Sequence, residues 1–149
     1  MEEQSFRNEG IKVTGRLTIT NPRTGEVLYE KDNLVVNVGL EYIADRMKDN
    51  TADALGYIAV GTGATAVSAT DTSLYAEIDR KAATSTDATD NTFVIDADWT
   101  EAEAVANWKE VAIFNAASSG VMFNRINVDF DKTAADPVNV QFTITFANT

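Results

Sequence analysis

The chain has 149 residues, with 12 lysines and arginines against 23 aspartates and glutamates, so its formal net charge is −11. This length suits one domain whose core needs no metal or disulfide staple. The excess of negative charge would repel a phosphate backbone, so we expect no direct binding to nucleic acid.

Cysteine and histidine are both absent from the sequence. Their absence excludes thiol nucleophiles, disulfides, thiolate and imidazole metal ligands, and the usual general base near neutral pH. No apolar run approaches the roughly 18 residues of a membrane span, and the N-terminus does not resemble a signal peptide. We therefore expect a protein that is not an enzyme, that has no cofactor, and that has no contact with a membrane.

The first ten residues, MEEQSFRNEG, place Phe6 among polar and charged neighbours. Such a segment cannot bury enough apolar surface to order itself. We predict a flexible N-terminal arm over residues 1–10 and a single domain over residues 11–149. If the arm orders against a partner surface, Phe6 and Arg7 are its expected anchors; the alternative is a frayed terminus.

Residues 11–20 alternate strictly between apolar and polar side chains, which is the period of a strand with one buried face. Turn residues around Pro22 and Gly25 end this strand. Residues 26–29 are predicted to return beside it as the second strand of a hairpin.

A helix is predicted next, over residues 37–50, with Asn37 as its N-cap. Its apolar residues recur at helical spacing and predict one buried stripe. The stripe consists of Leu40, Ile43, Ala44 and Met47.

The stretch YIAVGTGATAVSATDTSLYAEIDR, residues 57–80, carries the strongest local signal. Residues 57–60 are typical of a buried strand, and Gly61 and Gly63 permit a sharp exit from it. After an exposed loop, Asp71 is the expected N-cap of one short helical turn. That turn is predicted to bury Leu74, Tyr75 and Ile78 and to leave Asp71, Glu77 and Asp79 in water.

The second half of the chain reads mainly as strands and turns. Residues 79–86 are predicted to form a polar edge strand, 84–91 a turn-rich loop and 93–99 a strand, followed by a brief helical turn at 100–103. Residues 108–115 are predicted to form a central strand with both faces covered. Two more strands are predicted at 121–128 and 138–146, with a polar connection between them at 129–137. About eight or nine strands with one short α-helix favour a mainly β fold, an antiparallel β-sandwich of jelly-roll type.

Three groups of residues invite a functional interpretation, and each has a structural alternative. Gly61, Thr62 and Gly63 look like part of a phosphate loop, but no lysine or hydroxyl residue follows at the required spacing, so a structural turn is favoured. Trp99 and Trp108 could line a carbohydrate or protein contact, but both lie in apolar strand patterns that favour core packing.

Acidic residues form the third group, as possible calcium ligands or as a carboxylate pair for glycoside hydrolysis. The candidates are Asp87, Asp90, Asp96 and Asp98, and separately Asp129 and Asp131. Their spacing does not match a calcium loop, and no nucleophile elbow or oxyanion loop accompanies them. We therefore predict no metal site and no catalytic residue.

Four segments, taken in their order and spacing, resemble a family of small virion proteins of tailed bacteriophages, which are described as capsid decoration or tail-fibre-like proteins. The segments are NVGLEYIADRM (37–47), YIAVGTGATA (57–66), ATDTSLYAEIDR (69–80) and ANWKEVAIFNAASSGVMFNR (106–125). Phage decoration proteins as a class are small, β-rich and non-enzymatic, and often sit as trimers on the capsid.

The resemblance implies a capsid decoration protein that is made in the host cytoplasm and stabilises the shell from its outer surface. Its implied partners are the major capsid protein and further copies of itself, as a homotrimer. The second reading is a tail-associated, adhesin-type virion protein, although the sequence lacks the long fibrous repeats expected of a full tail fibre. The third reading is a carbohydrate-binding module.

Overall fold

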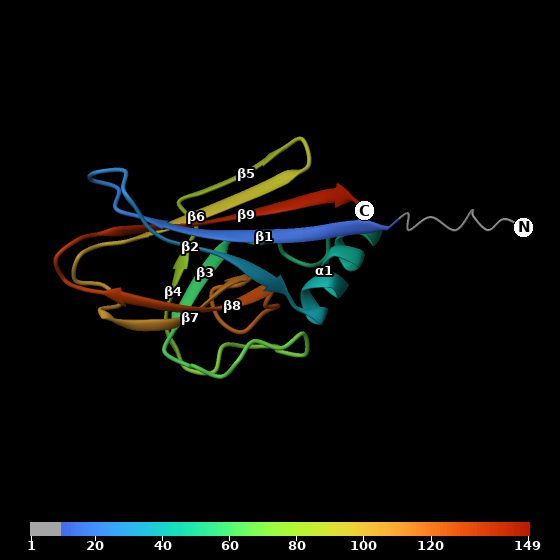
Figure 1. The fold of residues 1–149 in the computed structure, drawn as a ribbon. Helices are drawn as coiled ribbons and strands as arrows, with labels where there is room; N and C mark the ends of the chain where they lie inside the picture. The colour runs from blue at the N-terminus through green and yellow to red at the C-terminus, as the bar shows by residue number, and fades with distance from the viewer. Residues whose placement is uncertain (1–9) are drawn as a thin grey trace, which may run out of the picture.

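The computed structural model describes residues 10–149, which form nine strands and one helix. Figure 1 shows their arrangement. The elements are β1 (Ile11–Thr20), β2 (Val27–Val35), α1 (Asn37–Lys48), β3 (Tyr57–Gly61), β4 (Glu77–Ala82), β5 (Ser85–Thr89), β6 (Thr92–Trp99), β7 (Ala106–Phe114), β8 (Asn124–Lys132) and β9 (Val138–Asn148).

All nine strands pair antiparallel in one sheet of order β4-β3-β7-β8-β2-β1-β9-β6-β5, which curls into a half-barrel. The edge strands β4 and β5 are joined by Ala83 and Thr84. The backbones of these two residues form hydrogen bonds with both ends of the strand order. The N–H of Ala83 donates to the carbonyl of Gly56 beside β3, and that of Thr84 donates to the carbonyl of Asp96 on β6. The prediction of a mainly β fold with one helix is confirmed, whereas the jelly-roll arrangement stays a prediction.

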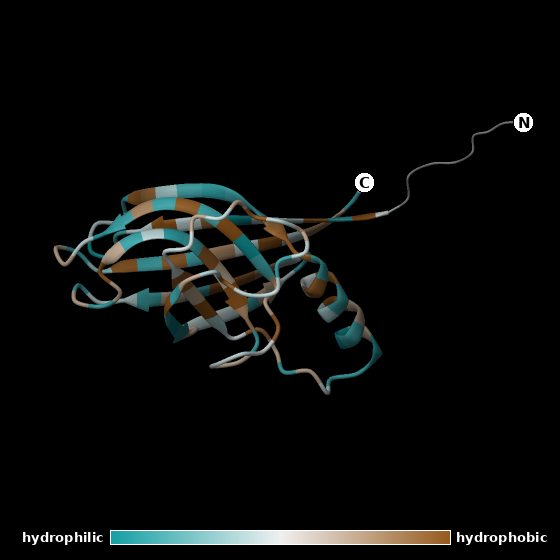
Figure 2. Ribbon diagram, turned by 90° about the horizontal axis from the view of Figure 1, so that it is seen from below, coloured by the Kyte–Doolittle hydropathy of each residue, from teal (hydrophilic) through white to brown (hydrophobic). Residues whose placement is uncertain are grey.

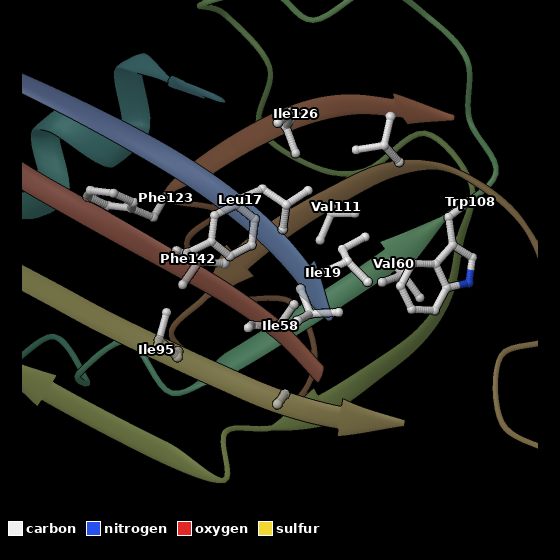
Figure 3. Packing of buried hydrophobic residues seen from close by; sticks show 14 of the residues in the cluster. Leu17, Ile19, Ile58, Val60, Ile95, Trp108, Val111, Phe123, Ile126 and Phe142 are labelled. Atoms are coloured by element: carbon white, nitrogen blue, oxygen red, sulfur yellow. The ribbon is translucent and has the colours of Figure 1, made fainter. Parts of the chain in front are cut away.

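The core fills the space between the two halves of the curled sheet. Figure 3 shows Leu17 and Phe142 of one half facing Val60 and Ile126 of the other. Figure 2 shows that apolar and polar residues alternate along the strands. The core is formed by apolar residues of these strands, because alternate side chains of a strand point to the same face.

The clearest alternations in the sequence gave correct predictions. β1 and β2 form the predicted hairpin, and Gly25 takes a positive φ of 76° in its turn. The last strand, β9, lies between β1 and β6 and buries its apolar face except at Phe146, which is partly buried. The buried residues of that face are Val138, Val140, Phe142 and Ile144.

β7 is buried on both faces, as predicted, and a register shift between Trp108 and Glu110 interrupts its alternation. Trp108 and Val111 therefore both face the main core, although three positions separate them. The even-numbered residues after the shift, including Ala112 and Phe114, pack in a second cluster on the outer side of the sheet.

The predictions for the helix were wrong in detail. α1 begins at Asn37, but its N-cap is Val36 and no side chain caps it. Its buried residues are Gly39 and Tyr42, whereas Leu40, Ala44 and Met47 of the predicted stripe are exposed. α1 contacts the sheet through Gly39, which lies against the backbone of Phe123, too close for a Cβ, and through Tyr42, whose ring meets that of Phe123. A helix in the middle of a sheet would bury a full stripe, but α1 sits at the end of the half-barrel.

Three further predictions also need correction. Residues 85–89, within the predicted loop, form the edge strand β5 by pairing with β6. Residues 100–103 form a turn in which the Thr100 N–H donates to Glu103, but no helix follows. β8 continues to Lys132 because the buried ammonium of that residue donates to three carbonyls, those of Thr100, Glu101 and Thr133.

Gly39→Ala should destabilise the protein by about 1–3 kcal/mol, because the new methyl group overlaps the carbonyl of Phe123. The exposed neighbour Glu41→Ala serves as control and should stay within about 0.5 kcal/mol of wild type. Denaturant unfolding measures both changes, and equal stability of the Gly39→Ala variant and wild type would contradict the close packing of α1.

Candidate functional site

Residues 62–76 connect β3 to β4 and form what we call the outer loop, which crosses the outer face of β3, β7 and β8 (Figure 1). Its backbone is bound by side chains that project from β7 and β8. One of them, Asn127, accepts the N–H of Val67 and donates to the carbonyl of Thr65. Residues 65–70 of the loop are mostly exposed, as the sequence predicted, but these bonds fix their backbone to the sheet.

Glu110 of β7 is the main acceptor beneath the outer loop and has no exposed surface. Its carboxylate accepts backbone N–H groups from Gly63 at 3.0 Å, from Tyr75 at 2.9 Å and from Ala76 at 2.7 Å. It therefore binds both ends of the loop at once.

Arg125 of β8 neutralises this carboxylate, and it too is fully buried. Its Nε donates to Glu110 at 3.0 Å and its Nη1 to Asp71 at 3.2 Å. Its Nη2 donates to the carbonyl of Thr65 at 2.9 Å, and the guanidinium lies over the ring of Tyr75, 4.6 Å from its centroid. A buried charge needs such pairing to be tolerated, and here every partner belongs to this chain.

Asp71 is therefore not the solvated N-cap predicted from the sequence. It is buried, its carboxylate accepts the N–H of Ser68 and the hydroxyl of Tyr75, and the segment forms no helix. The bond from the phenol to this carboxylate raises the pKa of Tyr75. Asp71 caps a turn within the loop and pairs with Arg125, a partner that no local pattern reveals.

Gly61 and Gly63 serve the same network. Neither has a positive φ, so the predicted reason for them was wrong. A Cβ on either residue would lie 2.6 Å from a carboxylate oxygen of Glu110. The two glycines let the backbone approach that carboxylate, and they form no phosphate loop.

Two further charged residues with shifted pKa values, Glu103 and Lys132, lie near the closing edge of the half-barrel. A hydrogen bond from Lys81 on β4 lowers the pKa of Glu103 to about 2. Burial lowers the pKa of Lys132. The Lys81–Glu103 salt bridge and the hydrogen bonds of Lys132 both connect the turn after β6 to neighbouring strands. Their role is structural.

The acidic candidates from the sequence lie apart from one another. Asp98 accepts from Asn139, Asp129 accepts from Lys109, and Asp87 accepts from Thr89. Among residues 10–149, no three acidic side chains come close enough together to hold a metal ion.

Trp99 and Trp108 are core residues, as predicted, and neither has exposed surface. Their rings meet edge to face at 5.4 Å. The indole of Trp99 donates to Asp79 and that of Trp108 to the carbonyl of Ala104. They are not available to a carbohydrate.

An apolar groove of about 390 Å³ lies between α1 and the strands β5, β6 and β9; we call it the α1 groove. Its apolar lining includes Tyr42, Ile43, Met47, Phe93, Phe123 and Phe146. Figure 2 shows α1 standing at one end of the half-barrel, away from the strands. Met47 is 82% exposed on the rim of this groove, and Ile11 is 73% exposed at the same end of the molecule.

Exposed apolar side chains that gather around a groove are typical of a protein-binding surface. The α1 groove is therefore the candidate functional site. Sequence reasoning missed it because Met47 and Ile43 were assigned to the core, and the exposed face of a helix becomes apparent only when its contacts are known. Phe6 and Arg7, the predicted anchors, lie outside the residues that the structure describes.

No family model, no curated protein and no solved structure matches the chain. Within the described part of the chain, α1 is too short and too polar to cross a membrane.

Replacing Glu110 by alanine should destabilise the protein by about 3–5 kcal/mol, because Arg125 would stay buried without its main counter-ion. Arg16→Ala removes an exposed ion pair with Asp32 and is the matched control, with an expected loss of at most about 1 kcal/mol. Urea unfolding followed by tryptophan fluorescence measures both values. Similar losses in the two variants would show that the buried network contributes no more than a surface pair.

Proposed function

We propose that this protein decorates the outer surface of a tailed-bacteriophage capsid and stabilises the shell, without enzymatic activity. The observation that carries the proposal is the position of the four segments that resemble such virion proteins. Three of them supply the buried network: Gly63 and Thr65 from the second, Asp71 from the third, and Glu110 and Arg125 from the fourth.

The first segment joins the same unit through α1. The Asn37 N–H donates to the carbonyl of Ala69 in the outer loop, and Gly39 packs on Phe123. The resemblance thus falls on one contiguous wall of the half-barrel, made of β3, β7, β8, the outer loop and α1.

The α1 groove is the surface that we propose for contact with the major capsid protein. The groove lies beside α1, at the end of the half-barrel. It combines exposed Met47 with the aromatic rings of Phe93 and Phe146. Burial of such side chains supplies affinity without any catalytic group. The jelly-roll type of β-sandwich belongs to the same proposal, because the two halves of the curled sheet face each other across one core.

Mixing the purified protein with undecorated capsids and imaging the particles tests the proposal. We expect ordered density over the shell, and retention on capsids should fall at least about tenfold in Met47→Glu, since a charge replaces an apolar contact. Val105→Glu, at an exposed apolar position beside β7, is the matched control and should bind like wild type.

Density only at the tail of complete particles would replace decoration with the tail-associated role. Absence of binding to any virion part, together with measurable affinity for a glycan, would favour a carbohydrate-binding module instead. Equal retention of Met47→Glu and wild type on capsids would keep decoration but exclude the α1 groove as the contact.

A further inference from the structure

The curled sheet splits where β2 leaves β1. β1 pairs with β9 along its whole length, but its pairing with β2 begins only at Gly15. Beyond Asn33, β2 turns away and pairs with β8. Figure 1 shows the two strands separating toward α1. Between them lies a gap that we call the β1–β2 fork.

The backbone on the β1 side of the fork is an open strand edge. Gly10 is bonded to Thr149 beyond the end of β9 through both its N–H and its carbonyl. Successive residues of an antiparallel ladder direct these groups to opposite sides, so those of Ile11 and Val13 point into the fork. In the described part of the chain no strand pairs with them there, and an open edge of this kind is a template for another strand.

Asn33 lies at the base of the fork and gives an independent indication of a missing partner. Its amide nitrogen and oxygen are both buried, and neither has a hydrogen-bond partner among the described residues. The amide lies so close to Gly15 that any Cβ there would overlap it. Buried polar groups are almost always bonded, and the backbone of an added strand offers both a donor and an acceptor.

The walls of the fork are apolar near its open end. It encloses about 750 Å³, and its apolar lining includes Ile11, Val13, Leu34 and Leu40. Ile11, Leu34 and Leu40 are unusually exposed for such residues, at 73%, 39% and 46%. An inserted strand would cover them with every second side chain.

We propose that the fork binds residues 1–9 of a second copy of this protein as an added strand, with Phe6 packed on Leu40 and Ile11. Nine residues extend to about 30 Å, which exceeds the edge of about 13 Å that four residues of β1 provide. The segment carries three glutamates and one arginine, and Lys12 lies along the receiving strand. The inference is independent of the proposed capsid role.

The position of Gly10 favours a second copy over the same chain. A tight hairpin back into the fork would need a residue with positive φ, and Gly10 is the one glycine available. Gly10 instead continues the β1–β9 ladder, because its N–H donates to the hydroxyl of Thr149 and its carbonyl accepts the N–H of the same residue. The chain thus passes the end of the fork, and exchange between neighbours fills every fork in a closed ring of copies.

Single-cysteine variants of the full chain test the exchange, because the natural sequence has no cysteine. Ser5→Cys protein is mixed with Leu40→Cys protein, oxidised mildly, and analysed by non-reducing electrophoresis and peptide mapping. A disulfide between these two sites can form only between copies. We expect a yield at least about tenfold above that of Ser5→Cys mixed with Val105→Cys, since docking raises the local concentration.

A third mixture, with Phe6→Ala added to the Ser5→Cys chain, should reduce the yield to that of the Val105→Cys control. Thermal unfolding of each variant confirms that it is folded. Equal yields in the Leu40→Cys and Val105→Cys mixtures would overturn the proposal. A Ser5→Cys/Leu40→Cys double variant that forms its disulfide only within one chain would overturn the exchange between copies.

Discussion

The ion pair between Glu110 and Arg125 is the interaction on which one wall of this protein depends. Both side chains are fully buried, and together they bind backbone groups at both ends of the outer loop. Without the loop, the two charges would lie on an open sheet face. Without the charges, the loop would lose the hydrogen bonds that Glu110 and Arg125 make to its backbone. The loop in turn covers the second apolar cluster and holds the start of α1 through Ala69.

The half-barrel consequently has two ends of different character. At the end that bears α1, the sheet splits and the helix stands away from the strands, which leaves the α1 groove on one side of it and the β1–β2 fork on the other. Apolar side chains such as Met47 and Ile11 stay exposed there. The proposed contact with a capsid and the proposed exchange of N-terminal segments use these two surfaces, so they can operate together.

The strands with regular alternation could be predicted from the sequence because one face of each is buried; β1 and β9 are examples. β7 was predictable as a central strand, but not its facing, because the register shift next to Lys109 reverses the alternation. Asp71 was misread since its partner Arg125 lies 54 residues away. One signal for the network was present in the sequence: Arg125 is the one charged residue in the predicted strand 121–128, and Glu110 has only Lys109 as a charged companion in the predicted strand 108–115.

Hydrogen exchange at the amides of Gly63, Tyr75 and Ala76 tests most directly whether the buried pair makes the outer loop part of the core. All three donate to the carboxylate of Glu110. We expect them to exchange as slowly as the amide of Ile113, which donates to buried Asn124 near the end of β7, because all four open only when the protein unfolds. Fast exchange at the three loop amides while Ile113 stays protected would contradict it.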